Sequence, residues 1–471
     1  MNNRIVIIIA LILAGTLAVG WWVGKDPSAD FTESLPGEDN RSTVMATLEK
    51  VNIGEFFERL ASDEVSMNEV WPGFRGARFD NYYYSDIALI DKFPESGPEI
   101  LWSVELGEGH AGAAVYKGLA YILDYDESDR ADMLRCFKLD SGEEQWRRWY
   151  KVNVKRNHGI SRTVPAVNED YIITIGPKCH VMCVERKTGD YLWGIDVAKE
   201  YESEVPLWYT GQCPLVIDKV LILATGGKNL LAGVDCKTGE VIWKTENPRG
   251  WKMSHASVLP FEFGGRKMYV YPAIGGIVGV AADGEFPGEV LWENTDWDHA
   301  VVSPSAVCMP DGKIFLTAGY GAGSMVIQLS EMDGVFSTST VDEFKPAHGL
   351  ASEQQTPVYF AGHLFGIQPK DAAALRNQFV CVNPINCKQT VWTSGKTNRF
   401  GLGPYILADG KFYLLNDDAT LNIIKASSSS FQLMDQYRLF EGHDAWAPIA
   451  VADGYMLLRD SKKMICLDMR K

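Results

Sequence analysis

One feature constrains the fold of this 471-residue chain more than any other: a short apolar stretch that ends in tryptophan recurs along it. The first five of these tryptophans are 44 to 50 residues apart, and the sixth follows after twice that interval. Phenylalanines occupy the middle of that gap and one later position, which gives eight markers: Trp102, Trp146, Trp193, Trp243, Trp292, Phe336, Trp392 and Phe431. Such a period indicates repeated units that bury their apolar faces against their neighbours.

Each unit has the same order of short apolar segments. In the second unit, an apolar run over 165–167 precedes a turn, a β-branched segment over 171–175, a tight turn over 185–189 and the tryptophan stretch. Four short strands per unit, with no helix of 10–15 residues between them, are typical of a β-propeller blade. We therefore predict an all-β fold, an eight-bladed β-propeller over residues 99–471.

The number of segments also predicts how the ring closes. The stretch ending at Trp102 precedes the first complete unit, and the last unit, over about 432–468, has no outer strand after it. Pairing the two would leave no half-paired blade at the junction. We expect the N-terminal strand to complete the C-terminal blade.

The residues before the propeller fall into three segments. Residues 1–25 contain an apolar run, Ile5 to Gly24, preceded by Arg4; this predicts an uncleaved signal anchor, a transmembrane helix with the body outside the cytoplasm. Residues 26–41 are predicted to be a linker. Residues 42–98 form an N-terminal arm, with an amphipathic helix predicted between Ser42 and Ser62 from its helical apolar spacing.

The segment Trp71–Gly76 of the arm allows two interpretations. Its aromatic residues favour packing on the side of the propeller. Alternatively, Arg75 and Arg78 could bind an anion.

The charge and the cysteines restrict partners and chemistry. The chain has 45 basic and 61 acidic residues, a net charge of −16, so a nucleic-acid partner is not expected. Nine cysteines leave at least one unpaired. Four of them hold equivalent places in strand-like runs and are predicted to fill the core: Cys136, Cys183, Cys381 and Cys466. The sequence leaves open whether disulfide bonds join Cys179 to Cys183 and Cys381 to Cys387.

Several motifs resemble a known family. The turn from Asp235 to Trp243 and its counterpart from Glu185 to Trp193 match the Asp-x-x-Thr-Gly-x-x-x-Trp pattern of the pyrroloquinoline-quinone-like (PQQ-like) propeller repeats. Trp71–Gly76 and Gly319–Ser324, together with Thr356-Pro357-Val358 and Gly362–Gly366, resemble further hallmarks of one branch. The resemblance covers about residues 70–471 and implies an eight-bladed extracytoplasmic propeller. The superfamily includes quinoprotein dehydrogenases and the propeller lipoprotein of the outer-membrane β-barrel assembly machinery, so it does not determine function.

The dehydrogenase branch implies an adjacent Cys-Cys pair, a calcium ion held by Glu, Asn and Asp, and an Asp base. No two cysteines are adjacent in this chain. A quinone-dependent oxidoreductase with PQQ and calcium is therefore kept as an alternative only.

Polar and aromatic residues gather just before the innermost strand of several units. Because those strands line the central channel, such residues would lie in loops on one face of the ring. The predicted ligand-binding set is His110, His158, Arg162, Gln212, Trp251, His255, His299, His348, Gln354, Arg399, His443 and Trp446. A concave, partly aromatic mouth with convergent polar groups is a typical binding site.

The resulting hypothesis is a membrane-anchored extracytoplasmic propeller that acts as a non-catalytic binding or scaffold protein for a protein or small ligand, with no cofactor. The first alternative is the quinone-dependent oxidoreductase. The second, based on the histidines, is a metal- or glycan-binding propeller. The Gly319–Ser324 segment lacks the lysine and helix of a phosphate loop, so it is predicted to be a strand turn that requires positive φ.

Overall fold

The computed structural model describes residues 3–24, 50–61, 65–157 and 159–471. The chain divides into two units, Met1–Asp39 and Asn40–Lys471, which are described separately. In the first unit, helix α1 spans Asn3–Gly24. Within the described residues, no helix meets the length and hydropathy that crossing a membrane requires. The predicted transmembrane span stays a prediction, and the predicted linker over 26–41 lies outside the described residues.

The second unit is a β-propeller of eight sheets, one per blade, as the sequence predicts, and the four strands of each blade pair antiparallel. Blade 1 contains β5 Ala114–Tyr116, β6 Leu119–Asp126, β7 Ala131–Lys138 and β8 Glu144–Lys151, and blade 2 contains β9 Ala166–Val167, β10 Tyr171–Ile175, β11 His180–Glu185 and β12 Tyr191–Asp196. Blade 3 contains β13 Leu215–Ile217, β14 Val220–Ala224, β15 Asn229–Asp235 and β16 Val241–Glu246, and blade 4 contains β17 Leu259–Phe263, β18 Arg266–Ala273, β19 Gly276–Ala281 and β20 Val290–Asn294.

Blade 5 contains β21 Val307–Cys308, β22 Lys313–Ala318, β23 Gly323–Met332 and β24 Val335–Phe344, and blade 6 contains β25 Val358–Phe360, β26 His363–Ile367, β27 Phe379–Asn383 and β28 Asn386–Thr393. Blade 7 contains β29 Tyr405–Ala408, β30 Lys411–Leu415, β31 Thr420–Lys425 and β32 Leu433–Arg438, and blade 8 contains β33 Ala450–Ala452, β34 Tyr455–Arg459, β35 Lys463–Asp468 and β4 Glu99–Glu105. Short helices lie between strands: α2 Val197–Glu200, η1 Pro346–His348 and η2 Ala373–Leu375.

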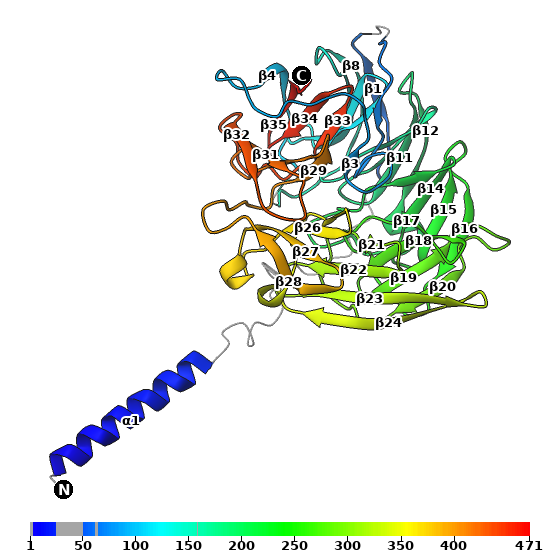
Figure 1. The fold of residues 1–471 in the computed structure, drawn as a ribbon. Coiled ribbons are helices and arrows are strands. Elements are labelled where there is room, and N and C mark those ends of the chain that lie inside the picture. The colour runs from blue at the N-terminus through cyan, green and yellow to red at the C-terminus, as the bar shows by residue number, and fades with distance from the viewer. Residues whose placement is uncertain (1–2, 25–49, 62–64, 158) are drawn as a thin grey trace. The chain divides into compact units, whose positions relative to one another are not determined.

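The ring closes as predicted. Strand β4 pairs antiparallel with β35, and Trp102 lies opposite Cys466. In Figure 1 the cyan strand β4 lies beside the red strands of the last blade. Segments from the two ends of the propeller sequence therefore share one sheet, and every blade has at least four strands.

The repeated tryptophan explains where the cysteines stand. On the neighbouring strand, the residue opposite each outer-strand tryptophan is small: cysteine opposite Trp102, Trp146, Trp193 and Trp392, glycine opposite Trp243 and Trp292. A Cβ on Gly233 would lie 2.2 Å from the Trp243 ring. The indole lies over its partner strand and leaves room for only a small side chain. The core role predicted for these cysteines is confirmed, and all nine are free thiols.

The tight turns hold neighbouring blades together. Trp193 Nε1 of blade 2 donates a 2.8 Å hydrogen bond to the Cys236 carbonyl of blade 3. In the same turn Gly239 has φ +76, and a Cβ there would meet the Trp193 ring at 2.7 Å. Glycine is therefore required at this turn for two reasons: the backbone is left-handed, and a side chain would clash with the tryptophan of the preceding blade.

The arm differs from its prediction. Residues 42–49 lie outside the described part, but Phe56–Arg59 forms strand β1 rather than part of an amphipathic helix. It pairs antiparallel with β8, the outer strand of blade 1, and Phe56 stacks on Trp149 with ring centroids 5.6 Å apart. The apolar spacing of this segment favours a helix, but pairing with the open edge of β8 and stacking on its aromatic side chains favour a strand. The strand forms because tertiary pairing overrides local propensity.

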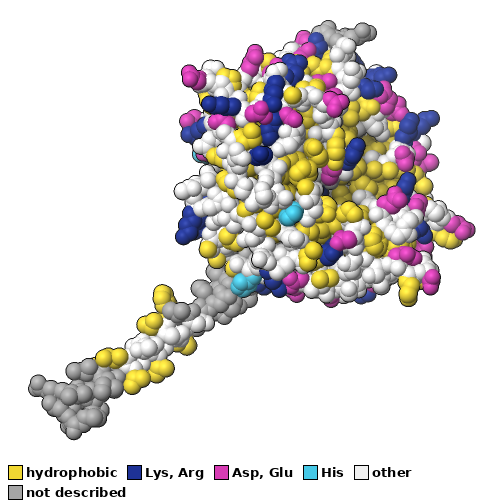
Figure 2. All heavy atoms as spheres, viewed as in Figure 1, with side chains coloured by type: hydrophobic (Ala, Val, Ile, Leu, Met, Phe, Trp, Pro, Cys, Tyr) yellow, Lys and Arg dark blue, Asp and Glu magenta, His cyan; other side chains and the backbone are white. Residues whose placement is uncertain are grey.

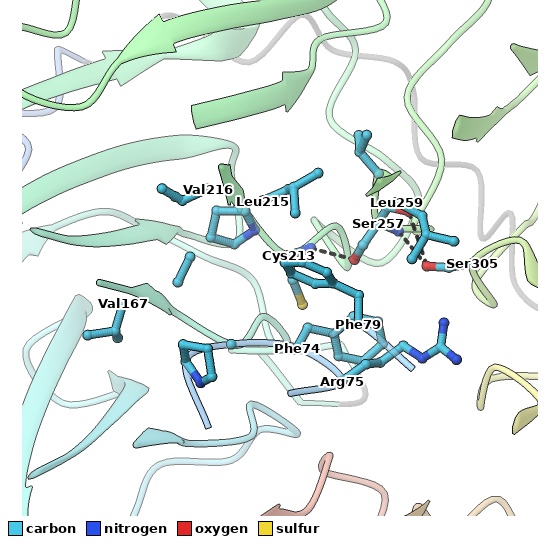
Figure 3. Close-up of a pocket in the computed structure, with 15 residues that line it drawn as sticks. Phe74, Arg75, Phe79, Val167, Cys213, Leu215, Val216, Ser257, Leu259 and Ser305 are labelled. Carbon is cyan, nitrogen blue, oxygen red and sulfur yellow. Dashed lines mark hydrogen bonds between the residues drawn. The ribbon is translucent and has the colours of Figure 1, made fainter. Parts of the chain in front are cut away.

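The second correction concerns the segment around Trp71–Gly76. It does not pack on the side of the propeller; residues 70–83, here called the plug, enter the central channel. Strand β2, Val70–Trp71, pairs with β5 of blade 1, and β3, Tyr82–Tyr83, pairs parallel with β29 of blade 7. Trp71 is 2% exposed. Between these strands the segment contacts the inner strands of further blades, as Figure 3 shows for Val167, Leu215 and Leu259.

The inner strands of blades 2 to 6 are joined by a chain of hydrogen bonds around the channel. Backbone N–H groups of one blade donate to the side chain of the next: Val164 to Cys213 Sγ, Cys213 to Ser257 Oγ, Ser257 to Ser305 Oγ and Ser305 to Thr356 Oγ1, at 2.9 to 3.3 Å. The two links through Ser257 and Ser305 are dashed in Figure 3. These side chains stand at the same place in successive repeats, so the repeat itself aligns the blades.

The outer surface mixes both signs of charge. On the face that Figure 2 shows, Lys and Arg side chains alternate with Asp and Glu, with apolar side chains between them. On this face no broad area carries a single sign of charge.

Candidate functional site

Two kinds of loop share the face of the ring opposite the backbone pairs of the plug. The first kind, here called the leading loops, connects the outer strand of one blade with the inner strand of the next. The second connects the two middle strands of a blade, such as β22–β23 and β30–β31. Because strands within a blade alternate in direction, both kinds lie at the same end of the channel. We call this end the mouth.

One side of the mouth is aromatic. Trp208, in the leading loop between blades 2 and 3, contacts Tyr320 of the β22–β23 turn in blade 5, with ring centroids 5.6 Å apart. It also stacks on His255, in the next leading loop, at 6.3 Å and 24°. Since Trp208 and Tyr320 come from blades that are not adjacent, the Trp208 loop reaches over the channel. Trp208 and Tyr320 both have positive φ, +62° and +58°.

Positive φ in bulky residues is strained and collects at sites where the surroundings fix the backbone. The strand turn predicted around Tyr320 is confirmed, with Gly321 and Gly323 also at positive φ. The mouth therefore carries an aromatic platform held in an uncommon backbone conformation.

Two titratable groups adjoin this platform. Burial lowers the pKa of Arg162 to about 10, offset by the nearby phenols of Tyr320 and Tyr209. Its guanidinium donates to the carbonyls of Asn157 at 2.8 Å and Gly159 at 3.1 Å. Burial, and then the charge of Arg162, lower the pKa of His255 to about 4. At neutral pH this side of the mouth therefore holds a neutral imidazole and a cation.

A second group at the mouth is acidic, and it adjoins the turn that carries Tyr320: a Cβ on Gly319 would lie 2.4 Å from Glu353 Cγ. Burial raises the pKa of Glu353, Asp371 and Asp417, and for Glu353 the neighbouring carboxylates raise it further while Lys370 lowers it. Glu353 lies in the leading loop of blade 6, Lys370 and Asp371 in the β26–β27 loop, and Asp417 in the β30–β31 turn. Three carboxylates and one lysine from blades 6 and 7 thus lie beside the Tyr320 turn of blade 5.

A stacked pair completes the mouth. The rings of His110 and Trp446 are 4.9 Å apart at 30°, and they come from the leading loops of blades 1 and 8. Trp446 Nε1 donates to Asp417 Oδ1 at 2.9 Å, and Gln355 Nε2 donates to the Trp446 carbonyl at 3.2 Å. The sequence-predicted His110 and Trp446 therefore meet, and they join the acidic side.

Three other predicted residues have structural roles. Gln212 is 1% exposed, and its amide binds the Ala224 backbone through both its oxygen and its nitrogen. Trp251 packs on Gly275 and Gly276 inside blade 4. Arg399 donates to the carbonyls of Lys396 and Arg376 within its own loop region. The side chains of these three are engaged within the propeller, and their predicted role in ligand binding stays a prediction.

The remaining predicted residues do not form one cluster. His299 packs edge-on against Trp297 at 4.3 Å, His348 is exposed in η1, and His443 is exposed in the loop before β33. Gln354 is half-buried beside Glu353, and His158 lies outside the described residues. The leading loops lie on one face of the ring, and among the described residues no three of these histidines are grouped to hold a metal ion. The ligand-binding role of the set stays a prediction.

The mouth also contains residues that the sequence analysis missed. Trp208, Tyr320 and the carboxylates of Glu353, Asp371 and Asp417 lie in it. Asp371 and Asp417 belong to the turns between middle strands, and the alternation of strand direction alone places those turns on the same face. The repeat therefore contained enough information to place Asp371 and Asp417 on this face. The position of Trp208 depends on its backbone conformation, which the repeat does not specify.

The residues present do not fit a quinone with calcium. Among the described residues, no group of three or more His, Cys, Asp or Glu side chains is arranged to hold a metal ion. Eight of the nine free cysteines are buried, and no adjacent pair exists to lie beside a quinone ring.

Comparison with known proteins agrees with this architecture. Residues 130–327 match the family model described as outer membrane protein assembly factor BamB. No curated protein sequence matches the chain.

Among solved structures, the chain is similar to BamB from Moraxella catarrhalis, at 12% identity and TM-score 0.51, covering 78% of this chain and 97% of that one. It is also similar to a europium-containing methanol dehydrogenase, at 11% identity and TM-score 0.58, covering 83% and 89%. A third similar structure is the computationally designed Ika8 protein, at 10% identity and TM-score 0.50, covering 79% and 100%. At these identities the likeness concerns the fold alone. With the family match, it confirms the resemblance drawn from the sequence: this chain is an eight-bladed β-propeller, and its residues 130–327 match the BamB family model.

Proposed function

We propose that this protein is a non-catalytic binding scaffold that works outside the cytoplasm and receives its partner at the mouth. The observation that carries the proposal is the contact of Trp208 with Tyr320, which brings loops of separate blades together above the channel. The plug fills the channel from the other end, so the mouth is the end of the channel that it leaves to a partner.

The chemistry of the mouth favours a polar protein segment that carries basic residues. Aromatic rings offer apolar and cation–π contact, and the carboxylates of Glu353, Asp371 and Asp417 lie in the same mouth, Glu353 beside the Tyr320 turn. Burial raises the pKa of these carboxylates because it destabilises their charged form, and a bound cation would stabilise that form. The family description, an outer membrane protein assembly factor, supports a protein partner in the cell envelope.

Membrane anchoring is the part of the proposal that rests on sequence. The apolar run from Ile5 to Gly24 and Arg4 before it favour an N-terminal anchor with the propeller outside the cytoplasm. Fractionation of cells tests it: the full chain should sediment with membranes, and a chain starting at Asn40 behind a cleavable export signal should be soluble in the envelope. Equal distribution of both chains would contradict the anchor and leave the binding proposal standing.

Site-specific photo-crosslinking tests the binding proposal. A photoreactive amino acid replaces Trp208 or Trp446 at the mouth, and Lys117 at the plugged end serves as the matched control. We expect one defined partner to crosslink from the two mouth positions and not from Lys117. The adduct should weaken when Glu353→Gln and Asp417→Asn are introduced together, because the acidic side is then neutral.

Two outcomes would overturn this function. Crosslinks of equal yield at the mouth and at Lys117 would remove the mouth as the binding face. Stoichiometric retention of added quinone with calcium, accompanied by dye reduction, would replace the scaffold with an oxidoreductase. The metal- or glycan-binding alternative is tested with His299→Ala and His348→Ala, which should leave metal affinity unchanged because no group of three or more His, Cys, Asp or Glu side chains among the described residues is arranged to hold a metal ion.

A further inference from the structure

A buried arginine in the plug has no protein partner for its charge. Arg75 is 6% exposed, and its Nε is enclosed without a hydrogen-bond partner. Within the described residues, no hydrogen bond or ion pair links its guanidinium to an acceptor. The nearest negative charge, Asp80, already accepts hydrogen bonds from the Tyr82 backbone N–H at 3.1 Å and the Tyr84 hydroxyl at 2.6 Å.

Such an arrangement is unfavourable unless something else compensates it. An arginine remains charged at neutral pH, and taking an unpaired charge out of water is expensive. Burial lowers the pKa of Arg75, but only to about 10, so the guanidinium stays a cation. Arg75 also has φ +64, a conformation that the rest of the plug must enforce. The chain therefore holds a cation at the centre of the ring.

Arg75 lines two small cavities inside the channel. The first, of about 50 Å³, lies between the plug and blades 2 to 5 and includes Ser257 and Ser305 (Figure 3). The second, of about 10 Å³, lies towards blades 6 to 8 and includes Gln355 and Tyr405. About 10–15 Å³ is enough for one water molecule, so the first cavity has room for one small ion with a water and for little more.

The hydroxyl groups around the first cavity do not supply the missing negative charge. Ser305 Oγ donates to the Ser257 carbonyl at 3.1 Å and accepts from the Ser257 N–H at 3.2 Å. Ser257 Oγ accepts from Cys213 N–H at 3.0 Å. These groups are neutral and already engaged in the links between blades.

The geometry points to an internal anion site: Arg75 binds one small inorganic anion, of the size of chloride, in the plugged end of the channel. The anion compensates the guanidinium and joins the plug to the inner strands of blades 4 and 5. This site is separate from the mouth and does not depend on the proposed partner.

The test compares thermal unfolding of the full-length protein in chloride with unfolding in gluconate at the same ionic strength. Gluconate is too large for the cavity. For a two-state propeller of this size, chloride at one hundred times its dissociation constant should raise Tm by about 3 °C. Arg75→Met should remove this difference. In gluconate it should be no less stable than the natural protein, because it removes a buried charge that nothing pairs.

Arg78→Met is the matched control. Arg78 belongs to the same segment, but its guanidinium is exposed and lies over the Tyr84 ring at 3.9 Å. This variant should keep the full chloride dependence, which separates the site from a general salt effect.

A second measurement needs no variant. Crystals of the natural protein grown in bromide should show an anomalous peak beside Arg75. Bromide peaks on the surface only, or the same Tm in chloride and gluconate, would overturn the proposal and leave water as the occupant of the cavity.

Discussion

The two ends of the central channel are built differently from the same repeat. At one end the plug adds strands to the inner edges of blades 1 and 7, and buries Trp71 among the inner strands. At the other end no strand is added; loops present Trp208, Trp446 and buried carboxylates towards the channel. The repeat thus provides a rigid ring, and segments outside the strand pattern make one end structural and the other end suited to binding.

The largest expected effect concerns the plug. Trp71→Ala should lower the free energy of unfolding by about 3–5 kcal/mol, the range for removing a fully buried tryptophan. Trp446→Ala, at the mouth, should lower it by only about 1–2 kcal/mol, because its ring is half-buried, stacks on one histidine and donates one hydrogen bond, to Asp417. Urea unfolding followed by fluorescence measures both. Equal losses would contradict the division between the two ends.

The turn glycines give a second contrast. Gly239→Ala places a Cβ against the Trp193 ring at positive φ, so we expect a loss of about 2–4 kcal/mol. Gly250, on the mouth side, has φ +66 but nothing within 4 Å of a Cβ, so Gly250→Ala should lose only about 1 kcal/mol, from the backbone alone. If thermal unfolding gave the same shift for both, packing against the tryptophan would not be the reason for the glycine.

The mouth should make stability depend on pH. His255 has a folded pKa of about 4, whereas the unfolded imidazole binds its proton near pH 6.5. Between these values the unfolded state holds more protons, so stability falls as the pH drops from about 6.5 to about 4. His255→Gln should reduce this loss by about 2 kcal/mol in denaturant unfolding at a series of pH values. His443→Gln, on the same face but exposed, is the control; an unchanged slope with His255→Gln would refute this assignment.

The smallest effect concerns the links between inner strands. Ser305→Ala removes the acceptor of the Ser257 N–H and the donor to the Ser257 carbonyl, and should lower stability by about 1–2 kcal/mol. Ser337→Ala, at an exposed position of β24, should change it by less than about 0.5 kcal/mol. A negligible effect at Ser305 would show that the blades are aligned without this hydrogen-bond chain.

The sequence predicts the architecture well because its signal is repeated. The tryptophan stretches, the tight turns and the unmatched stretch at Trp102 are sufficient to predict eight blades and their closure. The arm is predicted less well. Its apolar spacing suits a helix, but the edge of β8 is available only in the folded ring, and Phe56 pairs there instead.

The site is predicted in part, for a similar reason. The repeat places the leading loops on one face, and therefore His110, Arg162, His255 and Trp446 near the mouth. The repeat does not show which polar side chains point towards the channel. Gln212 forms hydrogen bonds with the backbone of its own blade, whereas Asp417 accepts a hydrogen bond from Trp446 of the neighbouring blade. Such choices depend on backbone conformations such as the positive φ of Trp208, which no spacing in the sequence encodes.

The plug has a consequence for the order in which the protein can assemble. Its residues are among the first of the body to leave the ribosome, yet several of the strands that enclose it are among the last. Strand β4, which follows the plug closely, must also wait for β35 before its sheet exists. The nascent chain therefore carries an uncovered tryptophan and an unpaired strand until synthesis is almost finished, and contacts between such distant residues make folding slow and late.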